Sequence, residues 1–337
     1  MAFRVLTSVP TTFKPYNATM KEMLEAAGFE VVQRWEDAGI PKDELIKLIP
    51  EFDGMIMGLD RLDADVIAAG KRLKVLAKYG VGYDNIDVEA ATKAGVVVAN
   101  TPGGNSTAVA ELAIGLMIAV ARDLVRSNSL VKSGSILPQV GPELEGKTVG
   151  IIGLGNIGKR VATRLAAFGC KILVNDIVTY PEWPHAFPIT YVSKEEIYRK
   201  ADIITVHTPL TPETRGMIGE KELRMMKPTA ILINTARGGI VDEGALAVAL
   251  KEKWIAGAGF DAYTLEPPVD PQTGKVFPML ENDNMTATTH IGGSTYEAIK
   301  RIGEMAATNV IRVLSGKKPI NAVNPEVAAK LADVAEE

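Results

Sequence analysis

The sequence of 337 residues has one cysteine, three histidines and no long hydrophobic run. The single cysteine, Cys170, excludes an intrachain disulfide and any metal site built from several cysteines. Its apolar surroundings favour a small buried residue over a nucleophile. The longest apolar run, residues 112–121, is much shorter than the roughly 20 residues of a membrane-spanning helix, so it predicts a buried helix. We therefore expect neither a metal centre nor a membrane span.

The sequence also lacks a large excess of charge of either sign, with 37 Lys and Arg residues against 41 Asp and Glu residues. The formal net charge is −4 and no block of Lys and Arg occurs, so the electrostatic pattern of a nucleic-acid-binding protein is missing. The first ten residues, MAFRVLTSVP, lack the features of a signal peptide, which predicts a cytoplasmic protein. Hydrophobic content of 47% and charged content of 23% are typical of a globular protein. The length exceeds the usual single domain of about 100–200 residues, which favours two domains.

What the sequence does contain is a regular alternation of short β-branched runs with longer amphipathic ones. This spacing predicts parallel sheets covered by helices, in an α/β fold of two doubly wound domains. The first series has predicted strands at 3–9, 31–35, 54–59, 74–80 and 96–100, with helices at 18–27, 42–49, 64–70 and 87–94. The second has strands at 148–153, 171–176, 202–208, 230–236, 255–262 and 284–290, with helices at 156–168, 193–200, 219–226 and 242–251.

The segment between the two series, residues 105–127, is rich in Ala and Leu and predicts one continuous helix. It is more apolar than one domain face needs, which suggests a two-fold interface between copies of the chain. A further predicted helix follows residue 290 and could pack back on the first series, making the first domain discontinuous. We therefore expect one domain formed by residues 1–100 and 291–337, with a second domain, residues 101–290, inserted in it.

The second series opens with a glycine-rich loop, GIIGLGNIGKR. Gly153, Gly155 and Gly158 follow an apolar strand and precede a helix, the arrangement that lets a backbone approach a dinucleotide pyrophosphate. Asp176 ends the next strand, where an acid holds ribose hydroxyls and repels a 2′-phosphate, so NAD is expected as the cofactor. A glycine-rich turn without ligand and an ordinary strand-end acid are the simpler alternatives.

Polar residues gather after the strands of this second series. Because ligands of such sheets bind beyond the carboxyl ends of the strands, these residues should share one edge. Arg237 has the bidentate guanidinium that grips a carboxylate. His290 can exchange a proton, and a carboxylate such as Glu266 favours a protonated imidazole. Each of the three, taken alone, could be a structural or solvated residue, and we favour a structural role for His207 and an exposed, idle His185.

Five stretches together resemble the D-isomer-specific 2-hydroxyacid dehydrogenases over nearly the whole chain. They are GIIGLGNIGKRVA, HTPLTPETRGMI, MKPTAILINTARGGIVDEGAL, GFDAYTLEPP and HIGGSTYEA, in the order of that family's signatures. The resemblance implies a Rossmann NAD-binding domain inserted in a flavodoxin-like substrate domain, and a homodimer. It also implies that Arg237 orients the substrate, His290 exchanges the proton and Glu266 tunes His290. The implied cofactor contacts are Gly153, Gly155, Asn156, Ile157, Gly158, Asp176, Thr208, Pro209, Thr235, Ala236, Arg237, Asp261, His290, Gly292 and Gly293.

The implied substrate is a small 2-hydroxy or 2-oxo acid. In the family the backbone of a Gly-rich segment of the first domain binds the substrate carboxylate, and KYGVGYDNID matches it with Lys78, Tyr79, Gly80 and Val81. The neighbouring sequence is most similar to the D-3-phosphoglycerate dehydrogenases. However, this chain has Met57 to Asp60 where such members commonly carry an Arg, and Lys78 replaces a second Arg. A phosphate prefers several cationic donors, and only Lys78 and Arg61 are suitably placed.

Three alternatives stay open at this point. The chain could be a glyoxylate or hydroxypyruvate reductase. It could be an NAD(H)-sensing binding protein similar to transcriptional corepressors, although no basic stretch or tail supports that. It could also be a formate or phosphonate dehydrogenase, against which the pairing of His290 with Glu266 argues.

Overall fold

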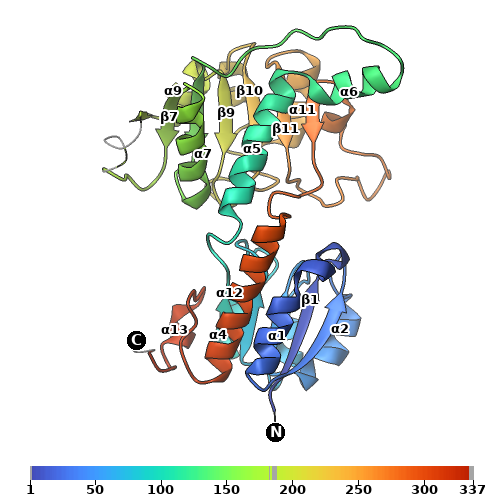
Figure 1. The fold of residues 1–337 in the computed structure, drawn as a ribbon, viewed down its shortest axis with the longest axis vertical. Coiled ribbons are helices and arrows are strands. Elements are labelled where there is room, and N and C mark those ends of the chain that lie inside the picture. The colour runs from blue at the N-terminus through green and yellow to red at the C-terminus, as the bar shows by residue number, and fades with distance from the viewer. Residues whose placement is uncertain (1, 182, 184–187, 334–337) are drawn as a thin grey trace. The chain divides into compact units, whose positions relative to one another are not determined.

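The computed structural model describes residues 2–181, 183 and 188–333 (Figure 1). The chain divides into two compact units. Unit 1 consists of Met1–Asn105 and Gly293–Glu337, and unit 2 of Ser106–Gly292. The boundaries predicted from sequence, after residues 100 and 290, lie a few residues before these divisions.

Unit 1 is built on a five-stranded parallel sheet with the order β2-β1-β3-β4-β5. This is a doubly wound order, in which the chain runs outward in both directions from β1 and β3. The central strands β1, β3 and β4 are buried along nearly their whole length because helices cover both faces of the sheet. The strands are β1 (Arg4–Val9), β2 (Glu30–Trp35), β3 (Gly54–Met57), β4 (Val75–Lys78) and β5 (Val97–Ala99).

Helices from both ends of the chain complete unit 1. On one face α1 (Ala18–Ala26) lies beside α12 (Tyr296–Leu314), and both bury apolar side chains against the sheet (Figure 1). The residues after 290 thus return to the first series of strands, and the core of unit 1 is complete only with α12. The other face is covered by α2 (Lys42–Leu48), α3 (Ala64–Ala69) and α4 (Val88–Lys93). The remaining short elements are η1 (Thr11–Tyr16), η2 (Ile49–Glu51) and α13 (Pro325–Ala328).

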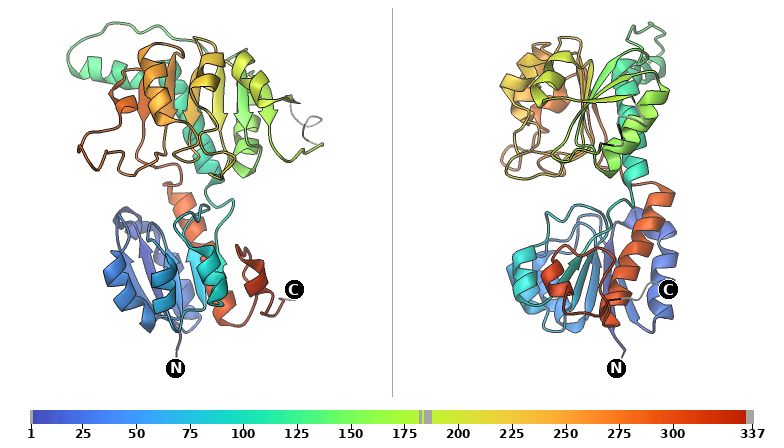
Figure 2. Two further views of the ribbon diagram at one scale, coloured as in Figure 1. Left: turned by 180° about the vertical axis from the view of Figure 1, so that it is seen from behind. Right: turned by 90° about the vertical axis from the view of Figure 1, so that its left-hand side faces the viewer.

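Unit 2 contains a seven-stranded parallel sheet with the order β12-β11-β10-β9-β6-β7-β8. The order reverses between β6 and β9, which is the switch point where dinucleotides bind in Rossmann folds. In Figure 2 the sheet is seen between two layers of helices. The strands are β6 (Thr148–Ile152), β7 (Lys171–Asn175), β8 (Ile189–Tyr191), β9 (Ile203–Val206), β10 (Ile231–Asn234), β11 (Gly257–Phe260) and β12 (Met285–Ala287).

Two hydrophobic clusters flank this sheet. On one face lie α5 (Ser106–Ala121) and α7 (Asn156–Ala167). Gly257 and Gly259 let α5 approach closely, because a Cβ at Gly257 would stand 2.7 Å from Val120 Cγ1. The other face is covered by α9 (Lys194–Lys200), α10 (Glu220–Met225), α11 (Glu243–Lys251) and the short η3 (Pro278–Glu281). The fold class predicted from the sequence, two doubly wound parallel-sheet domains, is confirmed.

One local prediction was wrong, and one short strand was missed. Residues 105–127 do not form one helix: α5 ends at Ala121 and α6 (Leu124–Lys132) begins after Asp123, whose φ of 49° is left-handed. An aspartate tolerates this conformation better than most residues, so the chain can turn where α5 leaves the sheet. The sequence also missed β8, which has only three residues and pairs with β7 alone.

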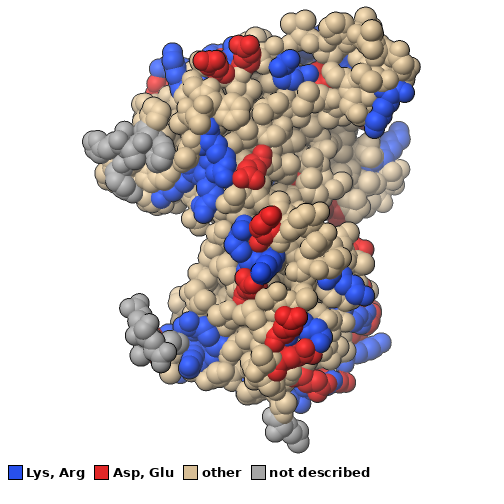
Figure 3. All heavy atoms as spheres, viewed as in Figure 1, with Lys and Arg blue, Asp and Glu red and all other residues tan. Residues whose placement is uncertain are grey.

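The distribution of surface charge and the lengths of the helices can be compared with the features expected of a nucleic-acid-binding protein and of a membrane protein. On the face of the molecule seen in Figure 3, acidic and basic side chains are interspersed. None of the helices in the described ranges is long and apolar enough to cross a membrane.

Candidate active site

The glycine-rich loop has the geometry that a pyrophosphate needs. Gly153 adopts a φ of 100°, and a Cβ there would lie 2.6 Å from the carbonyl oxygen of His207. At Gly158 a Cβ would stand 2.0 Å from the carbonyl oxygen of Gly153, so helix and loop pack as only glycine permits. Gly155 differs, because a Cβ there would meet no atom within 4 Å. Gly153 and Gly158 are therefore needed for close packing, whereas Gly155 leaves open space in front of the loop.

The helix that follows points its amino end at that space. Gly155 is the N-cap of α7 and supplies no side chain to its first amides, and Asn156 and Ile157 begin the helix. Unsatisfied amides and the helix dipole favour an anion at such a position. Asp176, after β7, accepts hydrogen bonds from the amides of Leu154 and Val178. Its carboxylate is thus held against the glycine-rich loop, as the prediction of a ribose-binding acid requires.

Two threonines at the carboxyl edge carry buried hydroxyls without a partner. Thr208 follows β9 and Thr235 follows β10, and the Oγ1 atoms of both have no hydrogen-bond partner among the described residues. Buried polar atoms are rarely left unsatisfied, so these hydroxyls fit a site that a ligand completes. Pro209, beside Thr208, is exposed.

His207 lies at the same edge but has the structural environment predicted for it. Its Nε2 is 2.9 Å from Thr205 Oγ1, and Nδ1 is buried without a partner among the described residues. Burial lowers the pKa of His207 to about 3, so the ring is neutral at physiological pH. A neutral, enclosed imidazole is not a proton donor for a substrate. His185 lies outside the described residues, and Cys170 is buried.

The other histidine, His290, forms a pair with Glu266. His290 Nδ1 lies 2.8 Å from each carboxylate oxygen of Glu266, and the two side chains are 43% and 35% exposed. His290 adopts a left-handed φ of 54°, which is uncommon for a residue other than glycine. Such conformations persist where the surroundings hold them in place, and they cluster at functional sites.

The carboxylate of Glu266 is favoured in its ionised form. Burial alone would raise the pKa of Glu266, but the hydrogen bond and charge of His290, the amide of Tyr263 and the charge of Arg237 lower it further than burial raises it. Arg237 therefore lies close enough to act on the pair. Its Nη1 also donates a hydrogen bond of 2.8 Å to the carbonyl oxygen of Ala236. Arg237, Glu266 and His290 thus occur in one electrostatic cluster within unit 2.

Asp261 holds the turn that carries His290. Its buried carboxylate accepts hydrogen bonds from the amides of Ile291 and Gly292, both at 2.8 Å, and from the hydroxyl of Thr288 at 2.6 Å. A Cβ at Gly292 would lie 2.9 Å from the same carboxylate, so only glycine fits. Both oxygens of Asp261 are occupied by the protein itself, which makes this residue a support for His290. Gly293 is the first residue of the C-terminal part of unit 1.

Two residues that the sequence analysis did not single out shape the turns around Arg237 and Glu266. Asn234 donates to the carbonyl of Arg237 and accepts from the amide of Ala236, at 2.8 and 3.1 Å. Glu243, in the first turn of α11, accepts from the amide and hydroxyl of Thr264 at 2.8 and 2.9 Å. The sequence did contain a signal for Glu243. Asp242 already caps α11, so a second acid directly after it is not needed to begin the helix and could have been considered for another contact.

In unit 1, the segment predicted to bind substrate follows β4. Lys78 is buried, and its ammonium donates to the carbonyl of Gly58 and to Asn85. The Tyr79 side chain is in the core, and the amides of Tyr79 and Gly80 donate to Met57 and Thr101. The Val81 amide has no hydrogen-bond partner in the described part of the chain. Of the amides of Tyr79, Gly80 and Val81, only that of Val81 is therefore left to bind a ligand.

Comparison with known proteins identifies the family. A model of the D-isomer specific 2-hydroxyacid dehydrogenase NAD-binding domain matches residues 114–292. The chain belongs to this family. It is therefore an oxidoreductase that acts on CH–OH groups with NAD, and the resemblance stated from its sequence is confirmed.

Relatives of this dehydrogenase carry different substrate names. The glyoxylate reductase of Thermococcus litoralis is 41% identical over 310 residues, which cover 89% of this chain and 92% of that protein. The D-3-phosphoglycerate dehydrogenase of Homo sapiens is 38% identical over 309 residues, 91% of this chain but 56% of that longer protein. A crystal structure of a Thermus thermophilus protein superimposes with a TM-score of 0.85 at 36% identity, covering 95% of this chain and 99% of the other.

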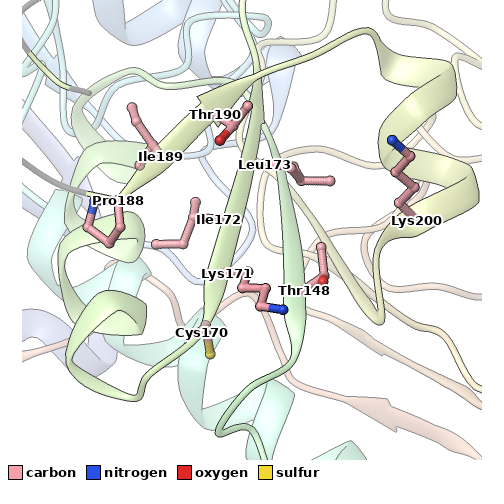
Figure 4. Close-up of a pocket in the computed structure, with 9 residues that line it drawn as sticks. All are labelled: Thr148, Cys170, Lys171, Ile172, Leu173, Pro188, Ile189, Thr190 and Lys200. Atoms are coloured by element: carbon pink, nitrogen blue, oxygen red, sulfur yellow. The ribbon is translucent and has the colours of Figure 1, made fainter. Parts of the chain in front are cut away.

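NAD fits the carboxyl edge of unit 2 on the observations above. The open space at Gly155, the bare amino end of α7, the acid at Asp176 and the orphaned hydroxyls all lie at the ends of neighbouring strands. A hollow of about 460 Å³ elsewhere in the dehydrogenase contains none of these residues (Figure 4). Thr148, Lys171 and Ile189 line it, and each is the first residue of its strand. That hollow is at the opposite, amino edge of the sheet.

Proposed function

We propose that this dehydrogenase interconverts a small 2-oxo acid and its 2-hydroxy acid, with His290 as the proton donor and acceptor. The observation that carries the proposal is the pairing of His290 Nδ1 with Glu266 at 2.8 Å. This contact leaves Nε2 on the opposite side of the ring, where it has no partner among the described residues. A positioned imidazole of this kind contributes about 10²–10⁴-fold to the rate of proton transfer.

The chemistry divides between the cofactor and the protein. The nicotinamide, when bound, supplies or accepts the hydride at C2 of the substrate. His290 gives its proton to the developing alkoxide during reduction and takes it back during oxidation. Glu266 keeps Nδ1 protonated, so that Nε2 faces the substrate as the reacting nitrogen. Arg237 binds the substrate carboxylate with its guanidinium. The substrate contacts of residues 78–81 stay a prediction from sequence.

The names of the relatives suggest which acids to test. Glyoxylate reductase and D-3-phosphoglycerate dehydrogenase both occur among proteins of similar identity, so identity alone does not choose between a small and a phosphorylated substrate. Glyoxylate and hydroxypyruvate are our first candidates, because relatives include proteins named glyoxylate reductase and hydroxypyruvate reductase. Each acid has a carboxylate for Arg237 and a carbonyl for His290.

The test is NADH oxidation at pH 7 with glyoxylate, pyruvate, hydroxypyruvate and 3-phosphohydroxypyruvate, combined with NADH binding followed by fluorescence. His290→Ala should lower kcat by about 10²–10⁴-fold and leave the Kd for NADH nearly unchanged. Glu266→Gln should lower kcat as well, whereas Glu281→Gln, an exposed acid of the same unit, should not. Full turnover by His290→Ala would refute the proton-transfer role. Tight NADH binding without turnover on any acid would favour an NAD(H) sensor.

We also propose a homodimer, supported by an exposed apolar arm. This arm, α6 and the loop after it, shows large hydrophobic side chains, with Ile136 88% and Val140 100% exposed. Large apolar side chains exposed on one segment favour an interaction site, and a second copy of the chain is the occupant that the resemblance implies. Sedimentation should give twice the mass of the 337-residue chain, and Ile136→Glu should shift it toward the monomer. The cytoplasmic location stays a prediction from sequence.

A further inference from the structure

The amino end of α7 holds a guanidinium whose hydrogen bonds all go to uncharged groups. Arg160 lies in the second turn of α7 and is partly buried. Its Nε donates to Thr107 Oγ1 at 3.1 Å, and its Nη1 donates to the carbonyl oxygen of Asn156 at 3.0 Å. Nη2 has no hydrogen-bond partner among the residues that the structure describes. Because Asn156 is the first residue of α7 and Thr107 the second of α5, the guanidinium lies beside the amino ends of two helices.

This position is unfavourable for a cation in the protein alone. The unsatisfied amides of a helix give its amino end a partial positive charge, which repels a guanidinium. Arg164, one turn further along α7, forms an ion pair with Glu111 at 3.0 Å. Within the described ranges no carboxylate pairs with Arg160 in this way. A partly buried charge is costly without a partner of opposite sign, so an anion from outside the chain would offset it.

The neighbouring cation, Lys159, makes contacts of a different kind. Its ammonium lies 3.3 Å from the centroid of the Tyr180 ring and 5.5 Å from that of Trp183. The faces of aromatic rings attract a cation, so the charge of Lys159 is used by the segment that follows β7. Arg160 instead contacts α5. Of these two adjacent cations, Arg160 is therefore the one that is placed to meet an anion at the amino end of α7.

The space next to this amino end belongs to the glycine-rich loop. Gly155 directly precedes Asn156, and a Cβ at Gly155 would meet no atom within 4 Å. A Cβ at Gly153 would lie 3.1 Å from Thr208 Cγ2, so the side chain of Thr208 borders the same loop. The Oγ1 atom of Thr208 is buried without a partner in the described part of the chain. Open space, helix amides and an unsatisfied hydroxyl thus occur together at the loop.

We propose that Arg160 binds the pyrophosphate of NAD. Nη2 donates a charge-assisted hydrogen bond to a phosphate oxygen, while Thr107 and the carbonyl of Asn156 fix the orientation of the guanidinium. Asn156 and Ile157 offer backbone amides at this end of the helix but no charge, so Arg160 supplies the charge. The inference concerns cofactor binding alone and is independent of the proposed role of His290 in proton transfer.

The first test is NADH binding by Arg160→Gln, followed by fluorescence at low and high salt. The Kd for NADH should rise about tenfold, as expected for the loss of one charge-assisted hydrogen bond. It should also depend less on salt than the Kd of the wild type. The matched control is Arg164→Gln, which removes the same charge from the next turn of α7 and should keep the Kd within about twofold.

Two results of this test would overturn the proposal. An unchanged Kd in Arg160→Gln, with a wild-type thermal melt, would show that the guanidinium does not contact the cofactor. An equal rise in both variants would assign the effect to the net charge of α7 rather than to a contact of Arg160.

The second test separates a pyrophosphate contact from a loosened loop, because Arg160 also joins α7 to α5. ADP-ribose contains the pyrophosphate and adenosine lacks it, and both are measured by their displacement of NADH. Arg160→Gln should weaken the binding of ADP-ribose about tenfold and leave that of adenosine within about twofold. Equal weakening of both ligands would mean that the variant disturbs the whole dinucleotide site, and the proposal would fail.

A second neutral variant guards against a loss of folding in Arg160→Gln. Arg160→Met keeps an unbranched, flexible side chain that can pack between α5 and α7. It should show the same rise in the Kd for NADH and the same selective loss of ADP-ribose. Wild-type affinity for both ligands in a folded Arg160→Met protein would refute the proposal.

Discussion

Replacement of His207 by glutamine should make the stability of this dehydrogenase less sensitive to acid. The ring lies after β9 with Nε2 on Thr205 and Nδ1 buried without a described partner. Burial lowers the pKa of His207 to about 3, whereas a histidine in the unfolded chain titrates near 6.5. Between these values the unfolded chain binds a proton that the folded protein does not accept. The folded state therefore loses stability as the pH falls through this window.

The size of the effect follows from proton linkage. Below pH 6.5 the free energy of unfolding should fall by up to about 1.4 kcal/mol for each pH unit, or about 2 kcal/mol between pH 7 and pH 5. This is an upper bound, because part of the residue still reaches solvent. The pKa of Glu266 is lowered, so the stability it contributes is lost only as the pH falls below the ordinary glutamate value of 4.5. Glu266 therefore contributes little to the pH dependence of stability between pH 5 and pH 7.

The assay is urea unfolding of both proteins at pH 7 and pH 5. The difference between the two pH values should be smaller in His207→Gln by up to about 2 kcal/mol, and the groups common to both proteins cancel in this comparison. Equal pH dependence in both proteins would refute the claim that His207 is held neutral by burial.

Further predictions concern the cofactor and the turns around it. Gly155→Ala should keep the wild-type melting temperature, since no atom lies within 4 Å of its Cβ, but should weaken NADH binding measured by fluorescence. Gly158→Ala should weaken binding and also cost about 1–3 kcal/mol of stability in urea, because its Cβ would stand 2.0 Å from a carbonyl oxygen. Asp176→Asn should raise the Kd for NADH more than that for NADPH, and an unchanged ratio would exclude a ribose contact. Glu243→Gln should lower kcat by about tenfold with an unchanged Kd for NADH, because the hydrogen bonds from Thr264 to this side chain would weaken. A parallel rise in the Kd for NADH would instead indicate a general loosening of unit 2.

Much of the fold could be predicted from the sequence because parallel strands buried on both faces leave uninterrupted apolar runs. The runs 148–152 and 231–234 needed no tertiary information to be recognised. Elements with little local signal were missed or misjudged. The three-residue β8 is a strand because it pairs with β7, and the break at Asp123 occurs where α5 stops packing on the sheet. Neither cause is local.

The candidate site divides in the same way. The glycine spacing predicted the loop, and the position of His290 after a strand predicted that it would lie at the carboxyl edge. The sequence did not indicate that Tyr79 would be buried, that Lys78 would donate to Gly58, or that Glu243 would hold Thr264. The partners in these contacts come from segments separated along the chain, and no pattern of spacing encodes them.

The sequence by itself determined the class of the protein, the alternation of strands and helices, the dinucleotide loop and the residue types needed for hydride and proton exchange. These properties depend on short-range patterns of burial and on motifs a few residues long. Only the tertiary structure decided that Glu266 meets His290 and that Asp261 holds the turn directly after His290. It also decided that the ammonium of Lys78 is buried near Asp60 and donates to the carbonyl of Gly58. A side chain's charge and reach are encoded locally, but the partner that uses them is chosen by the packing of distant segments.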